Sequence, residues 1–542
     1  MSDVPFETEV RSGSTGVAPD SARAASAGLV IIRPDDPRYR DLTVGNNWRW
    51  VSRPDYVVLP RLTKHVIQAV QEAVQTGRQI SVRSGGHCFA DFVDNPDVKV
   101  IVDMSQMNQV GFDKQREAFL VEAGASLLNV YLKLYKGWGV TIPAGFCYSS
   151  GVGGHITGGG YGFLSRAHGI ASEQLDAIEV VVVDKSGKAR SMVASCDPSD
   201  PNRELWWAHT GGGGGNFGIV TRLWFRTPGA AGNDPTQLLS RPPREVLLSA
   251  IGLPWSQLDE RRFIQMLKNY GSWHERNSSP HSPYRALCSV LMANHQSNPS
   301  CGMVTQIDAG VPNADELLED YLKEVIGDTG VQTHPMIHAV GELGPLPDLH
   351  PARRLPWMAS VKYLGTSNPT LTNPTQRDAH KSAYMRQSLT EGQIAKIYKH
   401  VTRTDYVNPT SHVALLGFAG GMINAVSSSH TASSHRDSVF MMLYQTFWTD
   451  SSEDPVNLEW LRGIYSDVYA ETGGYPVPNE ASDGCYVNCP DPDIMDPTQN
   501  RSGVPWYTFY FKENYRRLQQ VKAKYDPLNV FRHSQSITLP DK

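Results

Sequence analysis

The sequence predicts a two-domain α+β protein, and three observations support this fold class. The chain has 542 residues, more than one hydrophobic core usually serves. Up to about residue 227, short Val- and Ile-rich segments alternate with a helical segment, as in an α/β region. A Pro-, Gly- and Asn-rich stretch at 228–243 then separates this region from one that mixes helix-like and strand-like segments. We therefore expect a domain boundary near residue 228.

In the first region, strands are expected where Val, Ile and aromatic residues are enriched. A helix is expected at 63–78, between the first two of these strands, because apolar residues recur there at helical spacing, namely Val66, Ile67, Val70, Ala73 and Val74. The expected strands lie within 56–62, 79–85, 98–107, 118–126, 175–192 and 219–227.

The second region, from about 244 to 480, is expected to be an α+β domain. Residues 313–327 read as a helix, and 412–418 and 439–448 read as strands. The later segment 506–531 is expected to be helical up to Asp526, because Pro527 disfavours a helical conformation in the residue before it.

Composition excludes several functional classes. Hydrophobic residues make up 40% and charged residues 19% of the chain, which is ordinary for a globular protein. The net charge of -5 gives no support to nucleic-acid binding or to an anionic membrane surface. Seven cysteines are too few for a disulfide scaffold, and their spacing does not match a zinc site, so we expect no metal.

The first 28 residues are expected to form a loose N-terminal tail. They mix Ser, Ala, Gly and Pro with charges and lack the order of a signal peptide. No stretch reaches the roughly 18 apolar residues of a membrane helix. We therefore expect a cytoplasmic protein, or one exported by a route that the sequence does not reveal.

Three glycine-rich segments carry the strongest functional signal. The first, Arg83 to His87, follows a predicted strand, and its two adjacent glycines allow backbone N–H groups to approach a phosphate. Alone, such a pair is more often a plain tight turn. The second, 144–169, is too rich in glycine for a helix or strand, and a third lies at 210–225. Together they predict a chain that lies against a large, planar, phosphorylated ligand.

At this point the sequence resembles a known family. The motifs RSGGH, GxCxxxGVGGHxxGGGYG, GGGGNFGIVT and KYDPxNxF resemble the berberine-bridge-enzyme-like branch of the vanillyl-alcohol-oxidase-type flavoproteins, over residues 53 to 537. The segment 200–218 is most similar to bacterial members that tailor sugars or antibiotics. The resemblance implies a PCMH-type FAD-binding domain at 29–228, a substrate-binding domain with an antiparallel sheet at 229–495, and a C-terminal segment, 496–542, that returns to the first domain.

The resemblance also implies that FAD is held by two covalent bonds. His87 matches the histidine attached to the flavin 8α-methyl group, and Cys147 matches the cysteine attached to flavin C6. Such attachment should raise the redox potential of the flavin. It should also widen the active site, because fewer side chains are needed to hold the ring. Taken singly, His87 could be a histidine in a turn whose hydrogen bonds are all made within the protein, and Cys147 could be an unreactive buried thiol. Further cofactor contacts are implied at Arg83, Ser84, Gly85, Gly86, Cys88, Gly151, Val152, Gly153, Gly154, His155, Tyr161, Val220 and Asn488.

The catalytic base is where this sequence departs from the family. The resemblance places a tyrosine in a terminal YxNY strand, but this chain has Cys489 after Asn488. Cys489 could act as a thiolate, since an ordinary cysteine has a pKa of about 8.5, or it could be a passive wall. Tyr161 is the next candidate base, or it only contacts the flavin. Gln445 matches a family position near the substrate, and strand alternation places it on one face with Leu443.

Ser150 is expected to control the oxidant. Related enzymes regulate oxygen access to the flavin by side-chain size at this position, and a small serine favours O2 as electron acceptor and H2O2 as product. We therefore expect an oxidase acting on a hydroxyl group of a sugar, glycoconjugate or natural product. The alternatives are an oxidative cyclase or dehydrogenase that forms a C–C, C–N or C=C bond, and a flavin-loaded binding protein without turnover. The expected partner is a small molecule, and the expected assembly is a monomer or homodimer.

Overall fold

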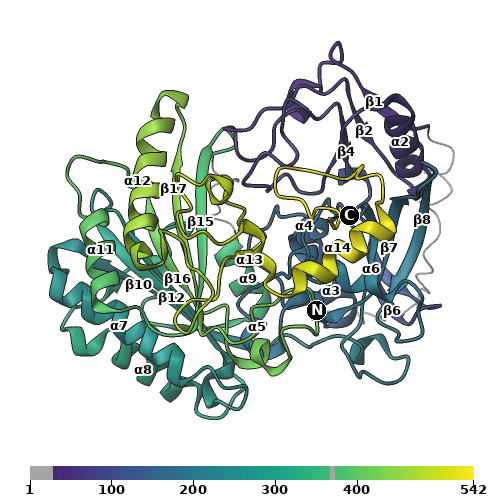
Figure 1. Ribbon diagram of the computed structural model, residues 1–542. Coiled ribbons are helices and arrows are strands. Elements are labelled where there is room, and N and C mark those ends of the chain that lie inside the picture. The colour runs from purple at the N-terminus through teal and green to yellow at the C-terminus, as the bar shows by residue number, and fades with distance from the viewer. Residues whose placement is uncertain (1–27, 366–372, 542) are drawn as a thin grey trace, which may run out of the picture.

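The computed structural model describes residues 28–365 and 373–541, which form two lobes (Figure 1). Strands β1 to β9 build one lobe, and strands β10 to β17 build the other. The predicted loose tail lies outside the described residues, apart from Gly28. The two lobes correspond to the two expected domains, while the exact boundaries at residues 228 and 495 stay predictions.

The first lobe contains two sheets. In the four-stranded sheet, three parallel strands follow one antiparallel edge strand, in the order β1 (Val30–Ile32), β2 (Tyr56–Leu59), β4 (Val100–Asp103) and β3 (Ile80–Arg83). The second sheet is antiparallel, in the order β5 (Val110–Asp113), β6 (Ala118–Glu122), β9 (Ile219–Phe225), β7 (Leu175–Val183) and β8 (Ala189–Ser195). Every strand predicted in this region is therefore present.

The predicted helix at 63–78 is confirmed as α2 (Thr63–Thr76). It buries Val66, Val70 and Ala73, and it ends at Gly77, whose φ of 65° lies in the left-handed region that favours glycine. The other helices of this part of the chain are α3 (Leu127–Trp138), α4 (Val152–Thr157), α5 (Ser165–His168) and α6 (Arg203–Ala208).

The second lobe is one eight-stranded antiparallel sheet with helices on its outer side (Figure 1). The strand order is β13 (His334–Pro335), β10 (Glu245–Pro254), β12 (Ser300–Asp308), β11 (Leu287–Asn294), β16 (His412–Leu416), β17 (Phe440–Trp448) and β15 (Arg377–Met385), and β14 (Arg353–Pro356) also pairs with β10. The helices are α7 (Glu260–Arg276), α8 (Ala314–Val325), α9 (Trp357–Gly365), α11 (Glu391–Val401) and α12 (Asp454–Val468). This confirms the predicted α+β fold with an antiparallel second domain.

Two local predictions were wrong. The segment from Cys485 to Cys489 is not a strand: it makes isolated hydrogen bonds to its neighbours and then turns, with the Cys489 N–H donating to the Tyr486 carbonyl. The helix expected from 506 is interrupted, because Lys512 has a φ of 48° and separates α13 (Trp506–Phe511) from α14 (Asn514–Tyr525). The predicted end before Pro527 is confirmed, since α14 stops at Tyr525.

The C-terminal segment packs back onto the first lobe (Figure 1). The guanidinium of Arg517 on α14 forms an ion pair with Glu204 of α6, at 2.6 Å. The buried Lys522 ammonium donates to the Asn216 carbonyl, at 2.7 Å, and pairs with Asp526. Asn216 belongs to the third glycine segment, so the end of the described chain fixes that loop.

Candidate functional site

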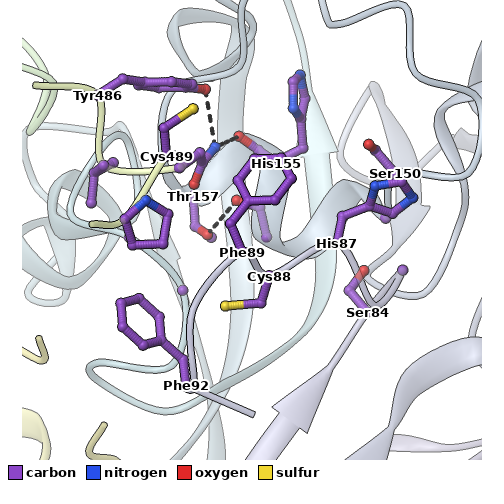
Figure 2. Close-up of a pocket in the computed structure, with 18 of the residues that line it drawn as sticks. Ser84, His87, Cys88, Phe89, Phe92, Ser150, His155, Thr157, Tyr486 and Cys489 are labelled. Carbon is purple, nitrogen blue, oxygen red and sulfur yellow. Dashed lines mark hydrogen bonds between the residues drawn. The ribbon is translucent and has the colours of Figure 1, made fainter. Parts of the chain in front are cut away.

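A cavity of about 360 Å³ lies where the two lobes meet, and all three glycine segments line it. Strands β11, β16 and β17 of the second lobe supply the facing wall. Most of that wall is apolar, formed by Val290, Met292, Ala414, Leu416, Phe418, Met441 and Leu443. Figure 2 shows Ser84, His87 and Ser150 on one side of this pocket, with Tyr486 and Cys489 on the other.

The first two glycine segments touch backbone to backbone. A Cβ added to Gly85 would stand 2.2 Å from the Gly151 nitrogen, and one added to Gly151 would stand 2.1 Å from Ser84 Oγ. No side chain fits at either position, so both loops present bare backbone to the cavity. Gly153 and Gly154, in the first turn of α4, also line it. Such a surface suits a flat ligand that lies close to the main chain.

Arg83 and Ser84 mainly hold the first loop in place. The buried Arg83 guanidinium pairs with Asp94 and donates to the Leu42 carbonyl at 2.8 Å. Its Nε forms no hydrogen bond with any described residue. Ser84 Oγ donates to the Ala123 carbonyl at 2.6 Å. Both residues line the cavity. Among the described residues, Nε is the only guanidinium nitrogen of Arg83 without a hydrogen-bond partner, so its N–H is available to a ligand.

The two predicted anchor residues meet at the cavity wall. Cys147 Sγ lies 3.8 Å from His87 Nδ1, and His87 Nε2 lies 2.7 Å from Ser149 Oγ. Burial lowers the pKa of the His87 imidazole to about 4, so the ring is neutral near pH 7. When Nε2 donates its proton to Ser149, the Nδ1 lone pair faces Cys147. Burial also raises the pKa of the Cys147 thiol.

Most of the other predicted cofactor residues line the cavity, whereas Val152 lies in the core. Cys88, Gly86 and Val220 line the cavity, and burial raises the pKa of the Cys88 thiol to about 12. Ser150 also lines it, beside Cys147. Val152 is fully buried in the core at the start of α4, and its side chain is not part of the wall.

Asn488 connects the second glycine segment to the 485–489 turn. Its amide donates to the His155 carbonyl and to the Tyr486 hydroxyl, each at 3.0 Å (Figure 2). A Cβ on Gly158 would stand 2.0 Å from Asn488 Oδ1, so this glycine makes room for the amide. The His155 ring accepts the Gly145 N–H at 3.0 Å, which ties the start of the glycine segment to α4.

Tyr161 stands in an aromatic cluster on the cavity wall. Its ring packs edge-on against Tyr486, with centroids 5.1 Å apart, and its hydroxyl lies 3.3 Å from Ser433 Oγ. Sequence reasoning did not single out Tyr486, although it stands two residues before the expected Asn488. Burial raises the pKa of the Tyr486 phenol. The structure therefore offers two phenol groups where the sequence suggested one.

Cys489 lines the cavity next to Tyr486 (Figure 2). Burial, and after it the negative charge of Glu342, raises the pKa of the Cys489 thiol well above its ordinary value. A thiol in this setting stays protonated at neutral pH. The geometry therefore favours the passive role of Cys489 over the thiolate base.

Gln445 faces the cavity from β17, as strand alternation predicted, while Tyr444 packs on the other face against Tyr465. The Gln445 amide donates to Glu342 Oε1 at 3.0 Å and contacts His380 Nδ1 at 2.9 Å. Its carbonyl oxygen lies 3.0 Å from His412 Nε2. No pattern in the sequence pointed to Glu342, His380 or His412.

These features fit FAD. The glycine loops form a bare backbone cradle, a buried Arg83 N–H has no partner among the described residues, and a neutral imidazole and a thiol converge at one point. Within 28–365 and 373–541, no group of three or more His, Cys, Asp or Glu side chains is placed to hold a metal ion. No helix in the same residues has the length and apolar character needed to cross a membrane.

Comparison with family models agrees with the geometry. Residues 54–191 match the FAD binding domain model, and residues 485–538 match the model described as berberine and berberine like. The first match contains the His87 and Cys147 loops, and the second contains the 485–489 turn and the C-terminal segment.

Similar proteins cover almost the whole chain. Aclacinomycin-N/aclacinomycin-A oxidase of Streptomyces galilaeus is 45% identical over 96% of this chain and 92% of that protein. Hexose oxidase of Chondrus crispus is 30% identical over 94% of this chain and 96% of that protein. The crystal structure of a glycopeptide hexose oxidase complexed with teicoplanin has 44% identity and a TM-score of 0.87, covering 94% of this chain and 99% of that one.

Proposed function

Because this chain belongs to the berberine-bridge-enzyme-like family of FAD-linked oxidoreductases, we propose that it oxidises a hydroxyl group of a sugar, glycoconjugate or natural product. The cavity carries this proposal: one wall is the glycine cradle with His87 and Cys147, and the facing wall is largely apolar. The names of the relatives, an aclacinomycin oxidase and a hexose oxidase, support the same substrate classes.

Two covalent bonds to FAD form part of the proposal. His87 would attach through its unprotonated Nδ1, and Cys147 through its sulfur. Each new bond would replace one C–H bond of the flavin, and O2 would take up the two electrons and two protons released. Support comes from the 3.8 Å distance between these atoms and from the burial that keeps the imidazole neutral, since a neutral ring is a nucleophile. Ser149 would hold the ring in the tautomer that leaves Nδ1 free of its proton.

The residues of the glycine cradle would hold FAD, which would supply a hydride acceptor, with O2 as the final oxidant and H2O2 as its product. The protein's part is to hold the substrate carbinol and to take the hydroxyl proton. We assign this role to Tyr161, which would take the proton as a phenolate: the residue lines the cavity, and its oxygen lies 3.3 Å from Ser433 Oγ, which can donate to it. Tyr486 packs against the Tyr161 ring and limits its orientation. Gln445 and the apolar strands position the rest of the substrate.

Ser150 would leave a passage for O2. Its side chain is small, it lies beside Cys147, and it lines the cavity. A branched side chain in its place would fill that space.

Oxygen consumption and peroxide formation with a panel of hexoses, glycosides and glycosylated polyketides test the proposed function. The expected result is equal amounts of O2 consumed, H2O2 formed and carbonyl product. An intramolecular C–C or C–N bond in the product would indicate the oxidative cyclase instead. No O2 consumption with any hydroxyl substrate that reduces the flavin would contradict the oxidase assignment.

A further inference from the structure

Glu342 carries a carboxylate into the cavity from a constrained turn. Two reciprocal backbone hydrogen bonds between Val340 and Leu343 close this turn, at 2.8 and 3.0 Å. The preceding Gly341 has a φ of 56°, and its N–H donates to Asn294 Oδ1 at 3.0 Å. A Cβ on Gly341 would stand 2.4 Å from Met292 Sδ. The turn is thus locked against β11, and Glu342 lines the cavity.

Buried hydrogen bonds fix the direction of this carboxylate. His380 Nε2 contacts the Asp378 carboxylate at 3.0 Å, which leaves His380 Nδ1 as an acceptor for Gln445. The second N–H of the Gln445 amide then donates to Glu342 Oε1. Its partners orient the Gln445 amide from both ends, and the amide in turn holds one oxygen of Glu342, whose side chain lines the cavity.

Little positive charge compensates Glu342. Burial raises the pKa of its carboxyl group and Asp378 adds to this effect, while His380 and the Gln445 amide oppose it. His380 also contacts the Asp378 carboxylate, and the other titratable groups that interact with Glu342 are the thiols of Cys147 and Cys489. His412, across the Gln445 amide, is neutral near pH 7, because burial lowers its pKa to about 4. Both of its nitrogens face acceptors, the Gln445 Oε1 atom and the Thr410 carbonyl, so any proton on this ring points away from Glu342. Among the described residues, Glu342 forms no ion pair with a lysine or arginine.

A partly exposed carboxylate in a largely apolar cavity favours a cationic ligand, since burial without a counter-charge is costly. We propose that Glu342 is a specificity residue that binds a protonated amine of the substrate, so that the preferred substrate carries an amino group beside its oxidised hydroxyl. Phe447, which lines the cavity and stacks on the His412 ring at 6.1 Å, offers an aromatic face to the same cation. The inference rests on the proposed function only in taking this cavity as the substrate site.

The test compares two probes of nearly equal shape that differ in charge, benzylammonium and benzyl alcohol. Each is titrated anaerobically at pH 7 into the flavin-loaded enzyme, and the dissociation constant is read from the change in flavin absorption. We expect benzylammonium to bind at least tenfold more tightly, which corresponds to about 1.4 kcal/mol. Glu342→Gln should bring the two constants together, while Glu319→Gln, an exposed position, should keep the preference.

Equal constants in the unaltered enzyme, or a preference that survives Glu342→Gln, would overturn the inference. If Glu342→Gln does not fold, the comparison of the two probes in the unaltered enzyme decides the matter, and Glu342→Asp should keep the preference for the cation. The titration needs no turnover. If the enzyme binds benzylammonium in preference to benzyl alcohol through Glu342 but oxidises no hydroxyl substrate, the proposed function is refuted and the inference about Glu342 stands.

Discussion

The sulfur of Cys147 and Nδ1 of His87 lie 3.8 Å apart, although 60 positions separate the two residues in the chain. His87 follows β3, and Cys147 precedes α4, so two independent glycine loops deliver the two reactive atoms. Contact between Gly85 and Gly151 brings these loops together. A single planar ring lying on the cradle can therefore meet both atoms along one edge.

Removing the anchors one at a time should separate the two attachments. We expect His87→Ala and Cys147→Ala each to keep flavin on the remaining anchor, and the double variant to release all flavin when denatured. Acid precipitation followed by peptide mass mapping measures this. Cys196→Ala, at an exposed cysteine, should leave both attachments intact. Covalent flavin in the double variant would show that the anchors are assigned incorrectly.

Enlarging Ser150 should slow the reaction with oxygen. Ser150→Leu fills the space beside Cys147, so reoxidation of the dithionite-reduced enzyme should slow at least about tenfold, a barrier change of about 1.4 kcal/mol. Ser150→Ala keeps the side chain small and should reoxidise at the original rate. Stopped-flow absorption in air-saturated buffer measures all three proteins. Equal rates for the leucine variant and the unaltered enzyme would remove Ser150 from oxygen control.

Replacing Cys489 tests whether its thiol takes part in catalysis. The raised pKa of this thiol keeps it protonated, so Cys489→Ala should change flavin reduction by substrate very little. Cys489→Tyr restores the family's residue and should accelerate reduction at least about tenfold, because a positioned base is worth about 10²–10⁴ in rate. Anaerobic stopped-flow reduction across pH distinguishes the outcomes. An inactive alanine variant would mean that the thiol is the base after all.

The Tyr161 hydroxyl should matter more than its hydrogen-bond partner. Tyr161→Phe keeps the ring packed against Tyr486 but removes the group that takes the substrate proton, so flavin reduction should slow by about 10²–10⁴. Ser433→Ala removes only the contact at 3.3 Å and should cost less than about tenfold. Reduction rates of both variants at saturating substrate provide the measurement. A fully active phenylalanine variant would move the base elsewhere in the cavity.

Acid should destabilise the fold through buried neutral histidines. Burial lowers the pKa of eleven imidazoles among the described residues, and the shift is large for seven of them, namely His87, His155, His209, His274, His412, His435 and His533. Below pH 6.5 these rings bind more protons in the unfolded chain than in the folded one, so their contribution to stability falls as the pH falls. Each ring contributes up to about 1.4 kcal/mol per pH unit until its folded pKa is reached.

Melting temperatures between pH 7.5 and pH 5 check the effect of these histidines. The melting temperature should decline steadily below pH 6.5. His209→Gln, away from the cavity wall, should make the decline shallower, while His281→Gln, at an exposed site, should leave it unchanged. A melting temperature that does not change over this range would show that these rings are not neutral in the fold.

Local patterns were enough to predict the elements and one face of the site. Gln445 was placed correctly because side chains in a strand alternate with a period of two. Its partner Glu342 is 103 positions away, in a turn without any periodic pattern, so only the tertiary structure brings the two together. The 485–489 segment contains residues common in strands, yet it turns because Asn488 is held by His155 and Tyr486 rather than by a strand ladder.

The position of residues 531–535 has a consequence for how the enzyme is made. Phe531, His533 and Gln535 line the cavity, and the His533 ring stacks on Phe92, with centroids 3.8 Å apart. During translation these residues leave the ribosome after the loops they cover. A nascent chain that already contains His87 and Cys147 still lacks this part of the cavity wall. The pocket is therefore complete only after the last residues of the wall have been synthesised.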